Sequence, residues 1–210
     1  MALVKLNNRG VRSATTFGSI SALGEMRFIK KLTASSSATL SFVDGSSDVV
    51  LDNTYKEYIF TFNNIHPATD DTYFSFNLST DTGSNYNVTK TTTYFCASHR
   101  EDGSSTQLAY KTNQDLTQST AFQGFNAADN MGNANDDCLS GYLHLFNPSD
   151  TTFVKHFMAV TNHNSQATPP YMINSFVAGY GNTVSAVDAI QFKQSSGNID
   201  AGDICLYGIN

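Results

Sequence analysis

The chain has 210 residues with a formal net charge of −6, so it does not have the strongly basic composition of a dedicated nucleic-acid-binding domain. Hydrophobic residues make up 40% of the sequence, which is enough to build a core without disulfides, and 210 residues suit one β domain. Charged residues are only 14%, below the roughly 25% of an average soluble domain, while Phe (15) and Tyr (10) are abundant and Trp is absent. This composition favours short strands joined by polar turns and does not suit surface helices.

The basic residues concentrate near the N-terminus. Residues 1–31 hold six basic side chains against Glu25 alone, whereas the rest of the chain is strongly acidic. We interpret residues 1–24 as an extended docking arm, with a floppy terminus as the alternative, because their apolar side chains are sparse and follow no helical period. Six charges scattered over 31 residues do not form a dense basic patch, which argues against nucleic acid and favours an acidic protein surface as partner. The arm residues expected to make this contact are Lys5, Arg9, Arg12 and Phe17.

The sequence shows no clear targeting segment and no cysteine pattern typical of disulfides or metal sites. The charged start at 1–8 is not followed by an apolar run, so no signal peptide is predicted, and no stretch approaches the roughly 18 apolar residues of a membrane span. Cys96, Cys138 and Cys205 are odd in number and form no Cys-x-x-Cys pair. We therefore expect free, mostly buried thiols in a protein assembled in a reducing compartment, and neither a disulfide framework nor a zinc site.

Period-two patterns begin at Met26. Residues 38–43 alternate apolar and polar side chains, and Asp44-Gly45 then gives the sequence of a tight hairpin turn. Residues 58–63 form a second alternating run, which His66-Pro67 should end because proline cannot donate a ladder hydrogen bond. Residues 74–79 show the cleanest alternation of the chain and predict a half-buried strand.

The second half continues the series after an interruption. Two further strands, at 94–98 and 107–111, should pair around the turn at 101–105. Residues 112–140 are the least regular part, and their run of Asn, Asp, Gly and Ala at 126–137 predicts a long surface loop. Regular strands are expected again over 141–146, 153–158, 174–180, 189–193 and 204–209.

About ten strands at 8–15-residue spacing, without a helical pattern or a repeat, predict an all-β fold. We expect a jelly-roll-like β-sandwich spanning 25–210, preceded by the N-terminal arm. Its strand edges must be covered, and its low-charge surface suits permanent contacts between copies of the chain.

Three groups of residues are candidates for sites of chemistry. His144 and His156 lie on adjacent predicted strands and could meet across a ladder, but the sequence offers no third metal ligand. Residues 99–103 place four ionisable groups at a hairpin tip, where solvated charge is expected. The run 129–137 lacks the ligand spacing and final Glu of a calcium loop. No nucleophile elbow or phosphate-binding motif is present, so we predict no catalytic, cofactor or metal site.

Several segments resemble a known group of proteins. They are FIKKLTASS at 28–36, FVDGSSDVVLD at 42–52, YKEYIFTFNNIHPATD at 55–70, SGYLHLFNPSDTTFVKHF at 140–157 and SSGNIDAGDICLYGI at 195–209. The chain is similar over most of its length, least at 100–140, to structural proteins of marine tailed phages, including those that infect cyanobacteria. The closing GDICLYGI at 202–209 is short and recurs in several phage appendage proteins. The resemblance implies a tail, fibre or head-decoration protein and no catalytic residues.

The prediction from sequence is therefore a non-enzymatic virion protein, assembled in the host cytoplasm, that forms a homo-oligomer. A trimer is expected, because phage appendages and decorations commonly have that symmetry, and other virion proteins are the expected partners. The alternative is a lectin-like module that binds a host-surface glycan, favoured if the loops at 80–90 and 126–137 cluster on one face. A glycan-degrading enzyme would need a pair of carboxylates about 5–10 Å apart in a groove, and the sequence indicates no such pair.

Overall fold

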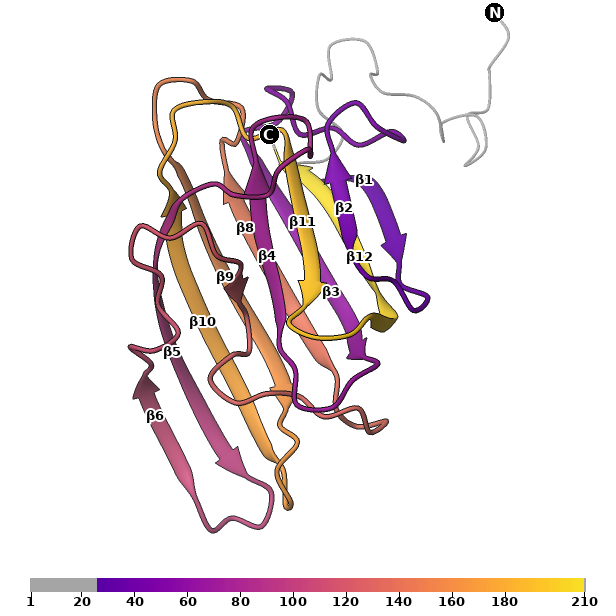
Figure 1. Cartoon of the computed structure of the whole chain (residues 1–210), viewed down its shortest axis with the longest axis vertical. Coiled ribbons are helices and arrows are strands. Elements are labelled where there is room, and N and C mark those ends of the chain that lie inside the picture. The colour runs from indigo at the N-terminus through magenta and orange to yellow at the C-terminus, as the bar shows by residue number, and fades with distance from the viewer. Residues whose placement is uncertain (1–25, 210) are drawn as a thin grey trace, which may run out of the picture.

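The computed structural model describes residues 26–209, and these residues contain strands and no helix (Figure 1). The prediction of an all-β protein is confirmed. No segment of this part of the chain is a helix long and apolar enough to cross a membrane. The strands are β1 (Met26–Thr33), β2 (Leu40–Val43), β3 (Glu57–Pro67), β4 (Phe74–Ser79), β5 (Lys90–Arg100), β6 (Thr106–Tyr110), β7 (Gln123–Gly124), β8 (Leu139–Phe146), β9 (Lys155–Asn164), β10 (Tyr171–Gly181), β11 (Ala189–Gln194) and β12 (Ile199–Ile209).

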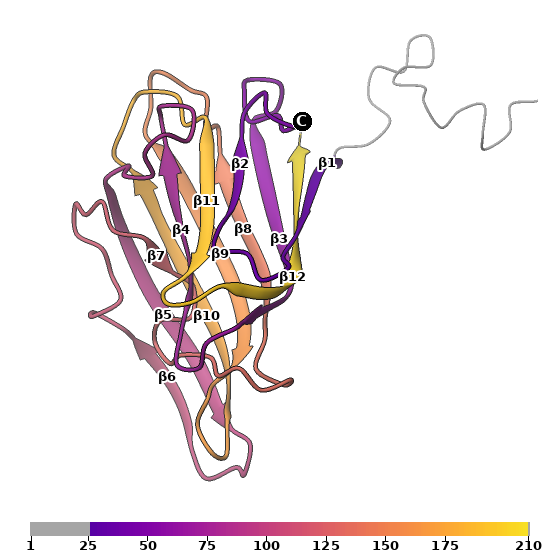
Figure 2. The same cartoon turned by 45° about the vertical axis from the view of Figure 1, so that its right-hand side comes forward.

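The strands form two antiparallel sheets of unequal width. The large sheet has eight strands in the order β1-β12-β3-β8-β9-β10-β5-β6, and the small sheet has four in the order β2-β11-β4-β7. The small sheet lies over one face of the large sheet, and the lower parts of β5, β6 and β10 extend beyond it (Figures 1 and 2). Within residues 26–209, this sandwich-like arrangement places no second layer over the other face of the large sheet.

Phenylalanine side chains from both sheets fill the space between the layers. Phe192 of β11 lies at the centre, with its ring centroid 5.5 Å from that of Phe60 and 5.4 Å from that of Phe62 on β3. Phe74 of β4 stacks on the same ring at 5.8 Å. Such edge-to-face and offset contacts add to the burial energy of the rings. The alternation seen in the sequence thus places one side of each strand in a shared aromatic core.

β4 differs from its sequence prediction, because all six of its residues are buried. Its polar side chains point away from the aromatic core, and Asn77 bonds to backbone that crosses the outside of the small sheet. The Asn77 amide donates to the carbonyls of Tyr86 (2.6 Å) and Thr120 (2.9 Å). The prediction that one side of this strand is exposed to solvent was therefore wrong, because two loops cover its polar side.

The Asp44-Gly45 turn forms, with Gly45 at a φ of 72°, but it does not join a hairpin. β2 pairs with β11 in the small sheet, whereas the next strand, β3, lies in the large sheet between β12 and β8. The residues between them carry the chain from one layer to the other. The hairpin prediction was wrong because a turn sequence specifies a local reversal but not the strand that becomes the neighbour.

The segment at 112–140 is irregular apart from β7 and the first residues of β8, but its expected surface position is wrong for several residues. Phe125 and Met131 are fully buried in the core, and Asn126 is also fully buried. The Asn126 side chain accepts a hydrogen bond from the Phe74 backbone NH at 2.8 Å. This segment therefore acts as a cover for the part of the large sheet that the small sheet does not reach. The docking arm predicted at 1–24 lies outside the described residues.

We expect the Phe192→Ala substitution to lower the free energy of unfolding by about 3–5 kcal/mol, because it leaves a cavity among five phenylalanine rings. Phe153→Ala is the matched control, since Phe153 is 70% exposed and should change stability by less than about 0.5 kcal/mol. Urea unfolding monitored by tyrosine fluorescence measures both. Equal losses for the two variants would contradict the central position of Phe192.

Candidate functional site

The uncovered face of the large sheet is the first candidate. We call the outward side chains of β8, β9, β10, β5 and β6 the outer face. Cross-strand pairs place large apolar residues side by side on it, such as Phe95 opposite Phe176, whose rings stack at 4.7 Å with an interplanar angle of 5°. Leu108 of β6 is 77% exposed and Met158 of β9 is 56% exposed. The other large exposed side chains of this face are Tyr110, Tyr142 and Met172.

The outer face carries no formal charge. All its residues are described, and none of the outward positions of these five strands is Asp, Glu, Lys or Arg. Its polar members are Thr, Asn, Ser and His side chains, and a shallow apolar hollow lies between Phe146, Met158 and Tyr180. Exposed apolar patches of several hundred Å² mark interaction sites. A large uncharged surface on an acidic protein is therefore a candidate interface.

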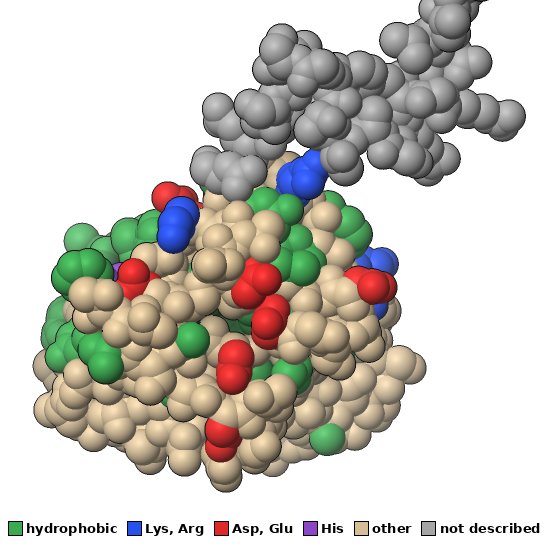
Figure 3. All heavy atoms as spheres, turned by 90° about the horizontal axis from the view of Figure 1, so that it is seen from above, with side chains coloured by type: hydrophobic (Ala, Val, Ile, Leu, Met, Phe, Trp, Pro, Cys, Tyr) green, Lys and Arg blue, Asp and Glu red, His purple; other side chains and the backbone are tan. Residues whose placement is uncertain are grey.

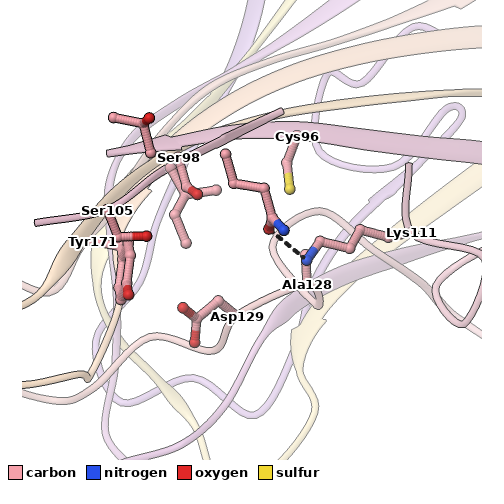
Figure 4. A pocket seen from close by; sticks show the side chains of 10 residues that line it. Cys96, Ser98, Ser105, Lys111, Ala128, Asp129 and Tyr171 are labelled. Carbon is pink, nitrogen blue, oxygen red and sulfur yellow. Dashed lines mark hydrogen bonds between the residues drawn. The ribbon is translucent and has the colours of Figure 1, made fainter. Parts of the chain in front are cut away.

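The second candidate is a polar pocket on the opposite side of the large sheet, where β5, β6 and β10 extend beyond the small sheet. Its volume is about 360 Å³. Figure 4 shows Asp129 pointing into the space between Tyr171 and Lys111. The lining is Cys96 and Ser98 of β5, Thr106 and Gln107 of β6, Tyr171 and Ile173 of β10, and Ser105, Lys111, Ala128 and Asp129 from connecting segments.

Electrostatics in the polar pocket reflect its partial burial. Burial raises the pKa of the Asp129 carboxyl above its ordinary value, and the Lys111 ammonium opposes this rise. Burial also raises the pKa of the Cys96 thiol, so this group stays protonated at neutral pH. Lys111 Nζ donates to Gln107 Oε1 at 3.4 Å. The pocket thus holds one carboxylate, one ammonium and a buried neutral thiol.

Side chains behind the pocket hold its walls in place. His163 Nε2 donates to the Asp129 carbonyl at 2.7 Å, and burial lowers the pKa of His163 to about 4, which keeps the ring neutral. The Arg100 guanidinium lies 5.6 Å from the centre of the Tyr171 ring and donates to the Thr168 carbonyl at 3.2 Å. A cation above an aromatic ring is attracted to it and limits its motion. Both the acid and the aromatic wall are therefore fixed before any ligand arrives.

The two histidines on adjacent strands do not meet as expected. His144 lies opposite Met158, and its Nε2 is 2.8 Å from a carboxylate oxygen of Glu57. His156 lies opposite Tyr180 of β10. They occupy diagonal positions on the outer face, and each has a different partner, because the register offsets them by two residues.

The loops at 80–90 and 126–137 lie at opposite ends of the sandwich. Thr82 donates its backbone NH to Asp188 in the loop between β10 and β11, whereas Asn130 donates its side-chain amide to Asp71 between β3 and β4. The clustering that would have favoured a lectin-like tip is therefore absent for this pair of loops. Within the 129–137 run, Asp129 is the one residue that lines the polar pocket. The described residues contain no group of three or more His, Cys, Asp or Glu side chains placed to hold a metal ion.

Acidic side chains gather at the end of the sandwich that bears the loops at 44–56, 80–89, 147–154 and 182–188 (Figure 3). Many of them cap turns: the Asp150 carboxylate, for example, accepts the backbone NH groups of Thr152 and Phe153. These hydrogen bonds lower the pKa of Asp150 and keep it ionised. We call this surface the acidic end; its carboxylates are Asp44, Asp48, Asp52, Asp81, Asp150 and Asp188.

Sequence reasoning did not find the pocket or the outer face. The run containing Asp129 was considered only for calcium, and Lys111 and Tyr171 carried no motif. The predicted pairing of 94–98 with 107–111 is confirmed by the β5-β6 hairpin, but the pairing of β5 with β10, which brings Tyr171 to this site, has no signature in the sequence. Comparison of the chain with protein-family models, with curated proteins and with solved structures finds no match.

Lys90 is the most perturbed lysine of the structure, and its surroundings indicate a structural role. It is fully buried, and its ammonium donates to Asn77 Oδ1 and, at 2.8 Å, to the Val88 carbonyl. Burial lowers its pKa to about 7. Lysines of lowered pKa serve as nucleophiles when they face a substrate site, but Lys90 does not line the polar pocket. Instead it joins β4 to the loop before β5.

This burial predicts a pH-dependent stability. The folded pKa lies below the unfolded value of 10.5, so the unfolded chain binds more protons between pH 7 and 10.5, and stability rises with pH in that window. From pH 7.0 to 8.5 the wild type should gain about 1–2 kcal/mol of unfolding free energy that the Lys90→Met variant does not gain. Urea titrations at the two pH values measure the difference. An identical gain in both proteins would mean that Lys90 is not the group responsible.

Proposed function

We propose that the protein is a non-enzymatic structural subunit of a tailed-phage particle, which associates with copies of itself through the outer face. The observation that carries this proposal is the uncharged, apolar outer face on an otherwise acidic chain. The virion assignment rests on the sequence resemblance to phage structural proteins. Assembly in the host cytoplasm agrees with three free cysteines, two of them buried.

We further infer that the sandwich is a jelly-roll variant. The strand orders of both sheets support this inference. The small sheet has the order β2-β11-β4-β7, and the large sheet contains the run β3-β8-β9-β10-β5-β6. An eight-stranded jelly roll has two four-stranded sheets of this interleaved order, with one strand where this chain has the β8-β9-β10 meander. β12 and β1 extend the large sheet at its other edge. On this interpretation the meander widens the sheet and generates most of the outer face.

A second copy of the chain is the partner that suits this face best. Five strands about 4.8 Å apart and about 30 Å long span roughly 700 Å², close to the approximately 800 Å² that each partner contributes to a stable interface. Symmetric association brings like surfaces near one another, and a face without formal charge causes no like-charge repulsion there. Three copies with their outer faces toward a common axis would bury it in the expected trimer.

The Met158→Asp variant tests self-association. It places a carboxylate at the centre of the outer face, where each copy would bring the same charge. The association constant of the oligomer should therefore fall at least tenfold. Val184→Asp is the matched control, because both positions are 56% exposed and Val184 lies in the loop between β10 and β11. Sedimentation velocity over a concentration series gives both constants. A monomeric wild type, or equal effects of the two variants, would contradict the proposed interface.

The N-terminal arm is proposed to attach the oligomer to the particle. Its Lys5, Arg9 and Arg12 complement a surface such as the acidic end, on a neighbouring copy or on another virion protein. Deletion of residues 1–24 should leave a folded oligomer that no longer joins the particle. Incorporation is measured by quantifying the protein in purified particles from cells that express full-length or truncated chain. Normal incorporation of the truncated protein would place the attachment elsewhere.

A further inference from the structure

The polar pocket is independent of the outer face and of the arm, because it lies on the other side of the large sheet under the segment that covers it. Its volume of about 360 Å³ is at the lower end of the range of about 300–1,000 Å³ for small-molecule sites. It can therefore enclose one ring-sized unit and not an extended chain. Self-association through the outer face leaves it accessible.

The lining combines hydrogen-bonding groups with an apolar wall. The Asp129 carboxylate accepts, the Lys111 ammonium donates, and the Gln107 amide does both. Hydroxyl groups of Ser98 and Ser105 complete the polar rim. The Tyr171 ring and Ile173 offer apolar contact. A ligand that suits this lining has hydroxyl groups around its edge and carbon–hydrogen bonds on its face.

Charge in the pocket points to an uncharged ligand. One carboxylate and one ammonium line it, so an anionic or cationic ligand would face one group of its own sign inside a partly desolvated site. Neutral hydroxyls, in contrast, donate to Asp129 and accept from Lys111 at the same time. Hydrogen bonds to ionised groups are the stronger ones, so these two residues should dominate the affinity.

The side chains of the pocket are held in positions that suit ligand binding and not bond cleavage. The neutral His163 fixes the backbone of Asp129 from behind, and Arg100 holds the Tyr171 ring. Hydrolysis of a glycosidic bond ordinarily uses two carboxyl groups on either side of the bond, and Asp129 is the single carboxylate among the lining residues. A rigid site with one acid supports recognition.

We propose that the polar pocket binds a single uncharged pyranose unit, either free or at the end of a glycan, with Asp129 and Lys111 bonding its hydroxyls and Tyr171 packing on its face. The pocket would give the particle contact with a sugar-bearing surface in addition to its structural role. Free sugar and glycan terminus share this chemistry, and a test with both distinguishes them.

The experiment uses the purified full-length chain and a panel of free glucose, galactose, mannose and N-acetylglucosamine, observed by saturation-transfer NMR, together with a glycan array. At least one neutral sugar should bind. Asp129→Asn should weaken that binding by about tenfold or more. This variant is expected to fold, because it removes a charge that burial disfavours. Tyr171→Ala gives a second test through the apolar wall, and its folding is checked by urea unfolding.

Glu101→Gln is the matched control, since it removes the same charge from an exposed position in the adjacent turn, outside the pocket lining. It should bind as the wild type does. Binding on the array without binding of free sugars would assign the site to glycan termini. No binding to either, unchanged binding by Asp129→Asn, or tighter binding of anionic than of neutral sugars would overturn the proposal. The oligomeric state of Asp129→Asn should stay that of the wild type, so this result is separable from the assembly test.

Discussion

The unequal width of the two sheets is the constraint from which the other features follow. Eight strands present one alternating apolar face toward the core, but the opposing layer has only four strands. Apolar surface that the small sheet does not reach must be buried by something else or remain exposed to water, at a cost of about 25 cal/mol per Å². The chain meets this requirement on the inner side with the segment between β6 and β8. On the outer side, none of the described strands or loops covers the apolar surface.

The covering segment shows how an irregular backbone can replace a sheet. Outside the short strand β7, its NH and CO groups find partners one at a time: some bond directly to strand backbone, as Ser119 does with Lys90, and others take part in side-chain hydrogen bonds with the strands. Thr92 of β5 accepts the Leu116 NH at 2.8 Å, and Asn126 accepts the Phe74 NH. Phe125 and Met131 then supply the apolar contacts that a strand would have supplied. Buried polar residues are thus the means by which this segment adopts one position.

The regular part of the fold could be predicted from the sequence because alternation is a local property. Residues 58–63 and 153–158 alternate, and both belong to strands or their immediate ends in the structure. Layer assignment could not be predicted, since the Asp44-Gly45 turn gives no information on whether β3 returns beside β2. Exposure of β4 could not be predicted either, because the loops that bond to Asn77 come from elsewhere in the chain. The polar pocket depends on the predicted β5-β6 hairpin, and also on the pairing of β5 with β10 and the position of Asp129, which are long-range and could not be predicted.

The two proposed surfaces have different origins, and this difference explains why they can coexist. The outer face exists because strands of a wide sheet alternate, so every inward Phe or Leu requires an outward neighbour, and here those neighbours are apolar or neutral. The polar pocket exists because the covering segment ends its contact with the large sheet before the ends of β5 and β6. Substitutions on one surface change side chains that point away from the other. Association and ligand binding are therefore expected to vary independently in this fold, although both surfaces share the backbone of β5, β6 and β10.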